Sequence, residues 1–289
     1  EALVAAIMMV KQDPQGAADF INSVFGDPIA AVASGLRHAI VAEPGHTFCT
    51  GDFAGIEMRD VLGLAGQHDK CELLAEIGSG IYLDMAEKIY NRAPGEWSGS
   101  AERIAHAKKA HVAEYTIGKN TILGSGFGMG WRTYHTKYCP DQPEEFAQKC
   151  ITDYRVDFAP KVPLVWYGLE EAALKAVRDK WHATAYGCTY EYCGDWLACH
   201  LPDGQTMWYR KPEFEANVPM RWNPADRRDT WWFWTYKNGQ WQRVQAYGGL
   251  LTNNVVQKRA RGYLVEAMYR LEAEGFPLVL TVHDECMSE

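Results

Sequence analysis

Acidic residues stand at two places where an apolar or β-branched stretch comes to an end. Asp52 follows "HTFCT" and precedes the pattern of a helix, and Asp284 follows "PLVLTV", between His283 and Glu285. Taken singly, each aspartate is best interpreted as the cap of a helix or a turn. Two aspartates held side by side would repel each other unless a cation neutralised them, and hard divalent ions prefer oxygen ligands. Such a pair can hold two Mg²⁺ ions about 4 Å apart for phosphoryl transfer.

The strands that would carry these aspartates lie at the two ends of the chain. Two short strands are predicted around the Pro44-Gly45 turn, and a last strand in "PLVLTV". Helical periodicity occupies most of the sequence between them, over residues 55–65, "KCELLAEI", "IYLDMAEKIY", 101–123, 144–158, 162–181 and 248–274. The pattern predicts an α+β protein whose sheet is assembled from both ends of the chain around a helical insertion.

Residues 183–241 differ in character from the rest of the chain. They are dense in Trp and Tyr, and turn residues at Cys193-Gly194 and Asp203-Gly204 predict hairpins. The aromatic stretch "TWWFWTYKNGQWQR" could be a base-stacking platform, but packing within the hairpins is the favoured interpretation. The cysteines at 188, 193 and 199 with His200 could suggest zinc, although their spacing fits no common zinc finger.

Composition restricts the class of protein. The chain has 289 residues, 47% of them hydrophobic, and a net charge of −8, which argues mildly against a nucleic-acid-binding protein. Basic residues nevertheless form two stripes, one over 103–137 opposed only by Glu114 and one over 255–270 opposed only by Glu266. No apolar run is long enough to span a bilayer and no basic segment precedes the apolar N-terminus, so we expect an intracellular protein with reduced cysteines.

Three segments in order along the chain resemble the motifs of one enzyme family. "DFAGIEMR" resembles motif A of the family A DNA polymerases, the bacterial DNA polymerase I type, and "VHDE" resembles their motif C. Between them, "GKNTILGSGFGMG" resembles motif B in the variant associated with phage enzymes. The stretches "FGDPIAAVASGLRHAIVAEPGH", "YGGLLTNNVVQKRARGYLVEAM" and "LPDGQTMWY" also look like phage members, so the resemblance covers nearly the whole chain.

The resemblance implies roles for the charged residues of these motifs. Asp52 and Asp284 would be metal ligands, with the Phe53 carbonyl as a further ligand. Glu57 matches the glutamate that blocks the 2′-hydroxyl of a ribonucleotide. Lys119 matches the lysine that pairs with the triphosphate and offsets charge on the leaving pyrophosphate.

The resemblance also implies a set of substrate-binding residues. Phe127, eight residues after Lys119 and therefore expected on roughly the same helix face, matches the aromatic residue that stacks near the templating base. Gln257, with Asn253 or Asn254, matches the positions that contact the primer-template minor groove. The resemblance adds Arg59, Leu123, His283 and Glu285 to this set, the last two as residues around the metal ligands or the primer end.

The chain departs from the family pattern at several positions. Ala54 and Gly55 stand where Ser and Gln are usual, which leaves backbone freedom beside the metal site. Tyr115 stands where an arginine commonly contacts the phosphates, so triphosphate affinity is in doubt. Leu123 replaces an aromatic residue that affects sugar discrimination, and Gln205 replaces a frequent arginine.

The family architecture implied by the resemblance is a right-hand polymerase core. An antiparallel-sheet palm would comprise residues 1–66 and 241–289, and a mostly helical fingers subdomain residues 67–240, with a hairpin insertion near 183–241. Nothing resembles the thumb, its Thr-Gly-Arg segment or a 3′→5′ exonuclease. We therefore expect an excerpt of a longer polymerase that could be inactive alone and would grip duplex DNA poorly.

The implied function is template-directed DNA synthesis, with deoxynucleotide transfer to a primer 3′-hydroxyl and release of pyrophosphate. The implied cofactor is Mg²⁺, two ions, with Mn²⁺ as a possible substitute. The partners would be primer-template DNA, deoxynucleoside triphosphates and unknown accessory proteins, and no membrane would be involved. The protein would act in the cytoplasm, which would be that of the host cell if a phage encodes it. Alternatives are a single-subunit RNA polymerase, a catalytically impaired nucleic-acid-binding module and an acid/base hydrolase with paired carboxylates.

Overall fold

The structure is a computed structural model that describes residues 12–35, 40–220 and 223–289. The chain divides into two compact units. The first comprises the described part of Glu1–Gly51 with Leu271–Val282 and Cys286–Glu289, and the second comprises Asp52–Arg270 with His283–Glu285.

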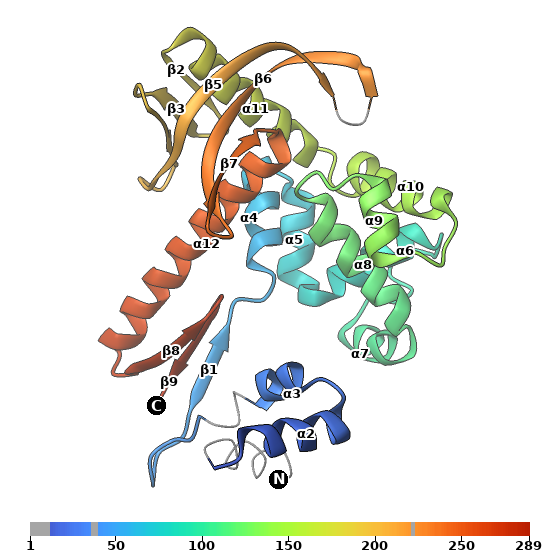
Figure 1. Cartoon of the computed structure of the whole chain (residues 1–289). Coiled ribbons are helices and arrows are strands. Elements are labelled where there is room, and N and C mark those ends of the chain that lie inside the picture. The colour runs from blue at the N-terminus through green and yellow to red at the C-terminus, as the bar shows by residue number, and fades with distance from the viewer. Residues whose placement is uncertain (1–11, 36–39, 221–222) are drawn as a thin grey trace. The chain divides into compact units, whose positions relative to one another are not determined.

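The first unit contains a sheet that draws its strands from both ends of the chain. Strands β1 (Cys49–Asp52), β8 (Leu278–Val282) and β9 (Glu285–Ser288) lie in the order β1-β9-β8 (Figure 1). The prediction that distant segments share one sheet is therefore confirmed. Helices α2 (Pro14–Phe25) and α3 (Pro28–Gly35) precede it.

The two short strands expected around the Pro44-Gly45 turn are only partly present. Residues 40–48 form no strand, and β1 begins at Cys49. Part of the first expected strand, residues 36–39, lies outside the described residues. The alternation that suggested a hairpin is short, and Pro44 cannot donate a hydrogen bond to a neighbouring strand.

The second unit is mainly helical in its first two thirds. Its helices are α4 (Ile56–Ala65), α5 (His68–Ile77), η2 (Gly78–Gly80), α6 (Ile81–Ile89), α7 (Ala101–Ala110), α8 (Val112–Ser125), α9 (Trp131–Tyr138), α10 (Glu144–Thr152), the π-helical turn η3 (Asp153–Phe158), α11 (Val162–Asp179) and α12 (Gly248–Ala273), whose last residues belong to the first unit. The single helix expected over 101–123 is two helices, because the backbone at His111 leaves the helical region.

Helices α4, α6, α8 and α11 meet in one hydrophobic core. Leu62, Met85, Ile122 and Leu169 are almost completely buried there. Burying a side chain of this size contributes about 1.5–3 kcal/mol. The helices are therefore held in fixed positions, and side chains on their outer faces acquire defined places.

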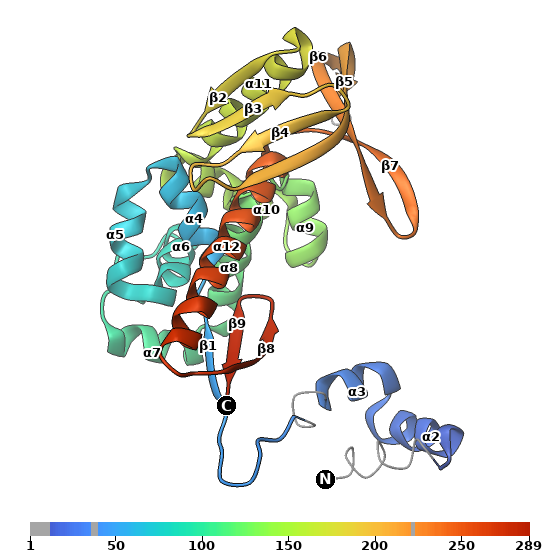
Figure 2. The same ribbon diagram turned by 90° about the vertical axis from the view of Figure 1, so that its left-hand side faces the viewer.

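A six-stranded antiparallel sheet follows α11 and confirms the hairpins predicted over 183–241. Its strands are in sequential order, β2 (His182–Ala185), β3 (Cys188–Tyr192), β4 (Trp196–His200), β5 (Thr206–Met220), β6 (Asn223–Lys237) and β7 (Gln240–Gln245). One face packs against α11 (Figures 1 and 2). Trp231 and Phe233 are buried on that face, whereas Trp232, Trp234 and Tyr236 alternate with them and point to the opposite face.

The structure gives no support to a zinc site in this sheet. Cys188 and Cys199 are buried and hydrogen-bonded to each other, whereas Cys193 is exposed. Over residues 12–35, 40–220 and 223–289, no group of three or more His, Cys, Asp or Glu side chains is placed to hold a metal ion. In the same ranges, no helix is both long enough and apolar enough to cross a membrane.

Candidate active site

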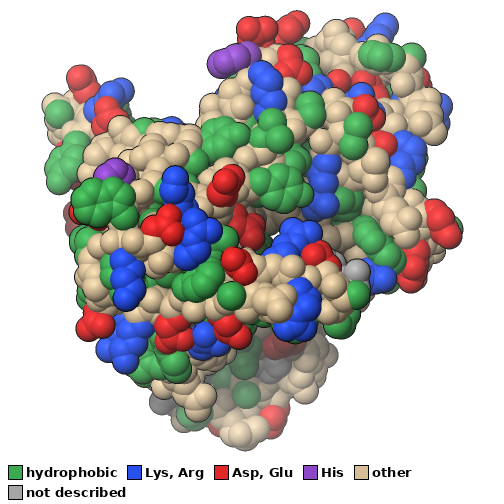
Figure 3. Space-filling view, turned by 90° about the horizontal axis from the view of Figure 1, so that it is seen from above, with side chains coloured by type: hydrophobic (Ala, Val, Ile, Leu, Met, Phe, Trp, Pro, Cys, Tyr) green, Lys and Arg blue, Asp and Glu red, His purple; other side chains and the backbone are tan. Residues whose placement is uncertain are grey.

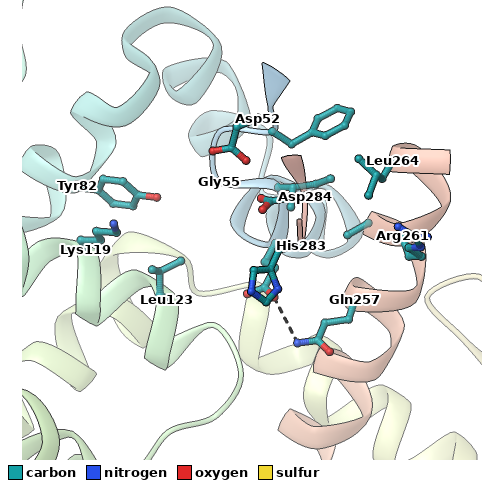
Figure 4. Close-up of a pocket in the computed structure, with 14 residues that line it drawn as sticks. Asp52, Gly55, Tyr82, Lys119, Leu123, Gln257, Arg261, Leu264, His283 and Asp284 are labelled. Atoms are coloured by element: carbon teal, nitrogen blue, oxygen red, sulfur yellow. Dashed lines mark hydrogen bonds between the residues drawn. The ribbon is translucent and has the colours of Figure 1, made fainter. Parts of the chain in front are cut away.

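The second unit contains a cavity of about 440 Å³ to which residues from five separate segments contribute. It is lined by Asp52, Phe53, Gly55, Ile56, Glu57, Tyr82, Lys119, Leu123, Gln257, Ala260, Arg261, Leu264, His283 and Asp284 (Figure 4). All of these residues belong to the second unit. The cavity thus collects residues from all three motifs that the sequence singled out.

Asp52 and Asp284 come together because their strands are neighbours. Asp52 is the last residue of β1, and Asp284 lies in the tight turn that connects β8 to β9. The backbone N–H of Phe53 donates to the carbonyl oxygen of Asp284 at 3.4 Å, and His283 has a φ of 55°, which suits a two-residue hairpin turn. Figure 4 shows the two carboxylates close together at the cavity wall.

Helix α8 supplies the opposite wall with Lys119 and, one turn later, Leu123. Figure 4 shows Lys119 across the cavity from the aspartates, beside Tyr82 of α6. The position of α8 is set by Gly118, where a Cβ atom would lie 2.0 Å from the carbonyl oxygen of Tyr82. Only glycine allows the two helices to approach this closely, so the residue before Lys119 sets the position of α8 against α6.

Tyr115, which replaces the arginine expected from the resemblance, is a packing residue. Its ring lies edge-on to the ring of Tyr82, with 5.7 Å between the centroids. Burial raises the pKa of both phenols, and neither carries charge near neutral pH. Tyr115 therefore orients Tyr82 at the cavity and supplies no positive charge.

Helix α12 supplies a third wall. Gln257, Ala260, Arg261 and Leu264 have the spacing i, i+3, i+4 and i+7, which places them on one helix face. The amide Nε2 of Gln257 donates to Oε1 of Glu57 at 3.3 Å, the hydrogen bond drawn in Figure 4. This bond restrains the carboxylate of Glu57 at the cavity edge.

A second contact between α4 and α12 lies one helical turn farther on. The Asp60 carboxyl oxygen Oδ1 accepts from the Tyr263 hydroxyl at 3.1 Å and pairs with Nη2 of Arg259 at 3.2 Å. Its other oxygen, Oδ2, is buried without a hydrogen-bond partner among the described residues. Burial raises the pKa of Asp60, while Arg259 and Tyr263 act in the opposite direction. The contacts of Asp60 with Tyr263 and Arg259 hold α4, which carries Glu57, against α12, which carries Gln257.

Gly55 begins α4 in a conformation that side chains disfavour. Its φ is 64°, and a Cβ atom would lie 3.2 Å from the methyl carbon of Met58 and 3.3 Å from the Tyr82 hydroxyl. The turn at Gly55 lets the chain pass from β1 into α4 within a few residues. Glu57 consequently faces the same cavity as Asp52.

Several residues expected at the site do not line the cavity. Helix α8 ends at Ser125, so Phe127 lies outside it, partly buried against the core, and the prediction that it shares the Lys119 face was wrong. Asn253 lies outside the cavity, and Asn254 donates to the Tyr209 hydroxyl. Arg59 is exposed and donates to the carbonyl of Ala54. Glu285 begins β9 beyond the turn.

The structure adds Tyr82 and Arg261 to the site. Arg261 could have been found in the sequence, because it lies one helical turn after Gln257 and belongs to the basic stripe over 255–270. Tyr82 is placed by the packing of α6 against α8, and no local pattern indicates it.

Two carboxylates of the cavity supply the kind of oxygen ligand that the implied Mg²⁺ would need. Asp52 and Asp284 offer carboxylate oxygens, and Phe53 also lines the cavity. Hard divalent cations prefer such oxygen ligands to nitrogen or sulfur. The residues therefore fit the group that the resemblance implies.

Fold and site together define a mixed α/β protein with antiparallel sheets in which two adjacent carboxylates face a lysine across an open cavity. No family model matches the chain. The chain is 29% identical over 270 residues to a DNA polymerase of Bacillus phage SP02, an alignment that covers 92% of this chain and 39% of that relative. The chain thus spans about two fifths of the length of the curated relative it matches. The resemblance to a phage DNA polymerase is supported, and its assignment to family A stays a prediction.

Proposed function

We propose that the chain carries the catalytic core of a template-directed DNA polymerase of the family A type. The observation that supports this most directly is the cavity in which Asp52 and Asp284 face Lys119. The similarity to the phage DNA polymerase covers 92% of the chain. Under this proposal, residues 1–66 and 241–289 form the palm, and residues 67–240 form the fingers.

In the proposed reaction, the primer 3′-hydroxyl attacks the α-phosphate of a deoxynucleoside triphosphate. A new bond forms between the 3′-oxygen and the α-phosphorus, the hydroxyl proton passes to solvent, and the bond from the α-phosphorus to the oxygen that bridges to the β-phosphate breaks, which releases pyrophosphate. The ammonium group of Lys119 offsets charge on the departing phosphates. Glu57, restrained by Gln257, leaves no room for a 2′-hydroxyl on the incoming sugar.

Asp52 and Asp284 would hold the metal ions, with the carbonyl of Phe53 as a further oxygen ligand. Bound Mg²⁺ would neutralise the carboxylate pair and offset the negative charge of the triphosphate. The partners under this proposal are primer-template DNA and deoxynucleoside triphosphates. Arg261, which lines the cavity on the α12 side, supplies a further positive charge toward a nucleic-acid phosphate.

Primer extension by Asp52→Asn and Asp284→Asn variants tests the proposal. Each change removes a charged ligand while keeping the size of the side chain, and we expect the rate of extension to fall about a thousandfold or more. Asp141→Asn is the matched control, because Asp141 is exposed and lies away from the cavity. Extension that persists in both site variants would refute the assigned roles. A protein long enough to grip duplex DNA is the appropriate background, since this chain spans two fifths of its relative.

One observation favours a second candidate, a nucleic-acid-binding module without catalysis. Tyr115 packs against Tyr82 in place of a phosphate-binding arginine. Tight binding of primer-template DNA together with no Mg²⁺-dependent extension by the unmodified protein would select this candidate. A preference for ribonucleotides over deoxynucleotides would instead select an RNA polymerase, against which Glu57 argues.

A further inference from the structure

The six-stranded sheet carries a second layer of aromatic side chains on the face that turns away from α11. Trp208 is 56% exposed, Trp241 49% and Tyr236 61%, with Trp196 close to them in exposure. The hydrophobic core lies on the other face of the sheet and does not include these rings. Figure 2 shows the strands from the side opposite α11. Exposed aromatic side chains that gather on one face of a protein often mark a binding surface.

The strand register arranges these side chains in a regular pattern. Trp196 of β4 lies opposite Arg210 of β5, Arg210 lies opposite Trp234 of β6, and Trp234 lies opposite Arg243 of β7. Aromatic and basic residues therefore alternate across four strands in one row. Such a row places rings and guanidinium groups at intervals of one strand spacing, about 4.8 Å. Of the two guanidinium groups, that of Arg243 is paired with Glu213 and Glu215.

The rings are held in place by contacts with one another and with the arginines. The guanidinium of Arg210 lies 4.2 Å from the ring centroid of Trp241, and that of Arg243 lies 4.2 Å from the ring centroid of Trp232. Trp196 and Trp208 meet edge to face at 6.4 Å. Because the side chains are already ordered, little conformational entropy is lost when a flat ligand binds to them.

This face carries both acidic and basic side chains, and Glu213 also accepts a hydrogen bond from Nε1 of Trp234. Glu213 and Glu215 are both paired with Arg243, whereas Arg210 and Lys211 form no ion pair with any described residue. Lys211 sits at a bulge in β5 with a φ of 46° and lines a small pocket with Arg210, Trp234 and Trp241. Figure 3 shows acidic, basic and hydrophobic side chains interspersed over the face of the molecule that is seen from above.

We infer that this face of the sheet binds single-stranded DNA, with bases stacked on the exposed indoles and phosphates near Arg210 and Lys211. The inference rests on the proposed function, which supplies an unpaired template strand as the ligand. Single-stranded DNA fits better than duplex, because only unpaired bases offer their flat faces to protein rings. A sheet with ordered aromatic side chains and a few basic residues has the chemistry of a sequence-tolerant stacking surface.

The test is the affinity of the protein for an unstructured oligothymidylate, measured by fluorescence anisotropy of a label on the DNA. Trp208→Ala and Trp241→Ala are each expected to weaken binding roughly tenfold, since each removes one stacking surface. Trp181→Ala is the matched control, because Trp181 is 67% exposed but lies at the end of α11, and it should leave affinity unchanged. Arg210→Gln is expected to weaken binding and to reduce its dependence on salt.

The same variants separate this inference from the proposed function. If the unmodified protein extends primers and Trp208→Ala and Trp241→Ala bind the oligothymidylate as tightly as it does, the inference fails while the proposed function stands. If binding weakens as expected but no extension occurs, the proposed function fails and the sheet remains a DNA-binding surface. A concentration-dependent dimer that dissociates in these variants, with unchanged DNA affinity, would make the face a contact between two copies of the chain and would overturn the inference.

Discussion

The cavity and the aromatic face of the six-stranded sheet hold their functional side chains by different means. In the cavity, Lys119 and Glu57 are placed by the backbone, through the close approach at Gly118 and the positive φ of Gly55. On the sheet, Arg210 and Trp241 are placed by the contact of one side chain with another. Under the two proposals, the difference follows from what each region must recognise. Phosphoryl transfer depends on positions to a fraction of an ångström, whereas base stacking tolerates small displacements.

The largest expected effect compares the two faces of the sheet. Trp231 is 1% exposed and packs edge to face on Tyr209, so Trp231→Ala should lower the free energy of unfolding by about 3–5 kcal/mol. Trp241→Ala, on the exposed face, should lower it by less than about 1 kcal/mol. Urea denaturation monitored by circular dichroism measures both changes.

Equal losses of stability in these two variants would contradict the division of the sheet into a packing face and a binding face. The comparison of Trp231→Ala with Trp241→Ala also sharpens the DNA-binding inference. Trp241→Ala should weaken the binding of single-stranded DNA without unfolding the sheet, so a loss of affinity cannot be ascribed to a loss of structure.

The next effect tests whether backbone packing positions the cavity. In Gly118→Ala, the added Cβ atom would lie 2.0 Å from the Tyr82 carbonyl oxygen, so α6 and α8 must separate. We expect the free energy of unfolding to fall by about 2–3 kcal/mol, and primer extension to fall with it because Lys119 moves. Thermal denaturation and single-nucleotide extension measure the two quantities.

Gly63→Ala is the matched control for Gly118→Ala. Gly63 lies within α4, is exposed, and a Cβ atom there would meet nothing within 4 Å. The higher helix propensity of alanine should therefore stabilise the protein by up to about 1 kcal/mol. A glycine-to-alanine substitution is thus expected to lower the free energy of unfolding at Gly118 and to raise it at Gly63. If Gly118→Ala raised it instead, α6 and α8 would be able to adjust without cost.

Periodicity and turn residues in the sequence were sufficient to predict most of the second unit. The hairpin turns at Cys193-Gly194 and Asp203-Gly204 lie where expected, because glycine after a polar residue has a strong local preference for a turn. The break at His111 was missed, because helical periodicity continues through it on both sides. Helices α2 and α3 were also missed: α3 is short and its small and apolar residues give a weak amphipathic pattern, whereas α2 has a clear one that was overlooked.

The residues that line the cavity were predictable where the motifs are local and not where packing decides. Asp52, Asp284 and Lys119 were singled out from short segments and are found at one cavity. Phe127 was misplaced because α8 ends at Ser125, and Phe127 lies in the loop that follows, where Gly128 has a φ of 79°. The close contact of Gly249 with the Phe127 carbonyl fixes this loop, and such contacts between distant segments leave no periodic pattern in a sequence.

The smallest expected effect concerns Asp60, the buried acid that joins α4 to α12. Burial raises its pKa above the ordinary value of 3.8, with Asp203 adding to the rise and Arg259 and Tyr263 opposing it. The folded protein therefore keeps a proton on Asp60 at a higher pH than the unfolded chain does. The stability that this group contributes is fully present below pH 3.8 and is lost as the pH rises through the raised pKa. The unmodified protein should therefore lose stability relative to Asp60→Asn as the pH rises through the raised pKa of Asp60.

The measurement is the difference in the free energy of unfolding between the unmodified protein and Asp60→Asn, followed from acidic to neutral pH. The difference cancels the titration of the other groups, and only its slope is interpreted, because the asparagine also changes the partner of Arg259. Tyr263→Phe sharpens the test. It removes a hydrogen bond that favours the carboxylate, so it should raise the pKa of Asp60 further and enlarge the loss of stability. A difference that grows in favour of the unmodified protein as the pH rises would mean that Arg259 outweighs burial, and that α4 is held to α12 by a net favourable ion pair.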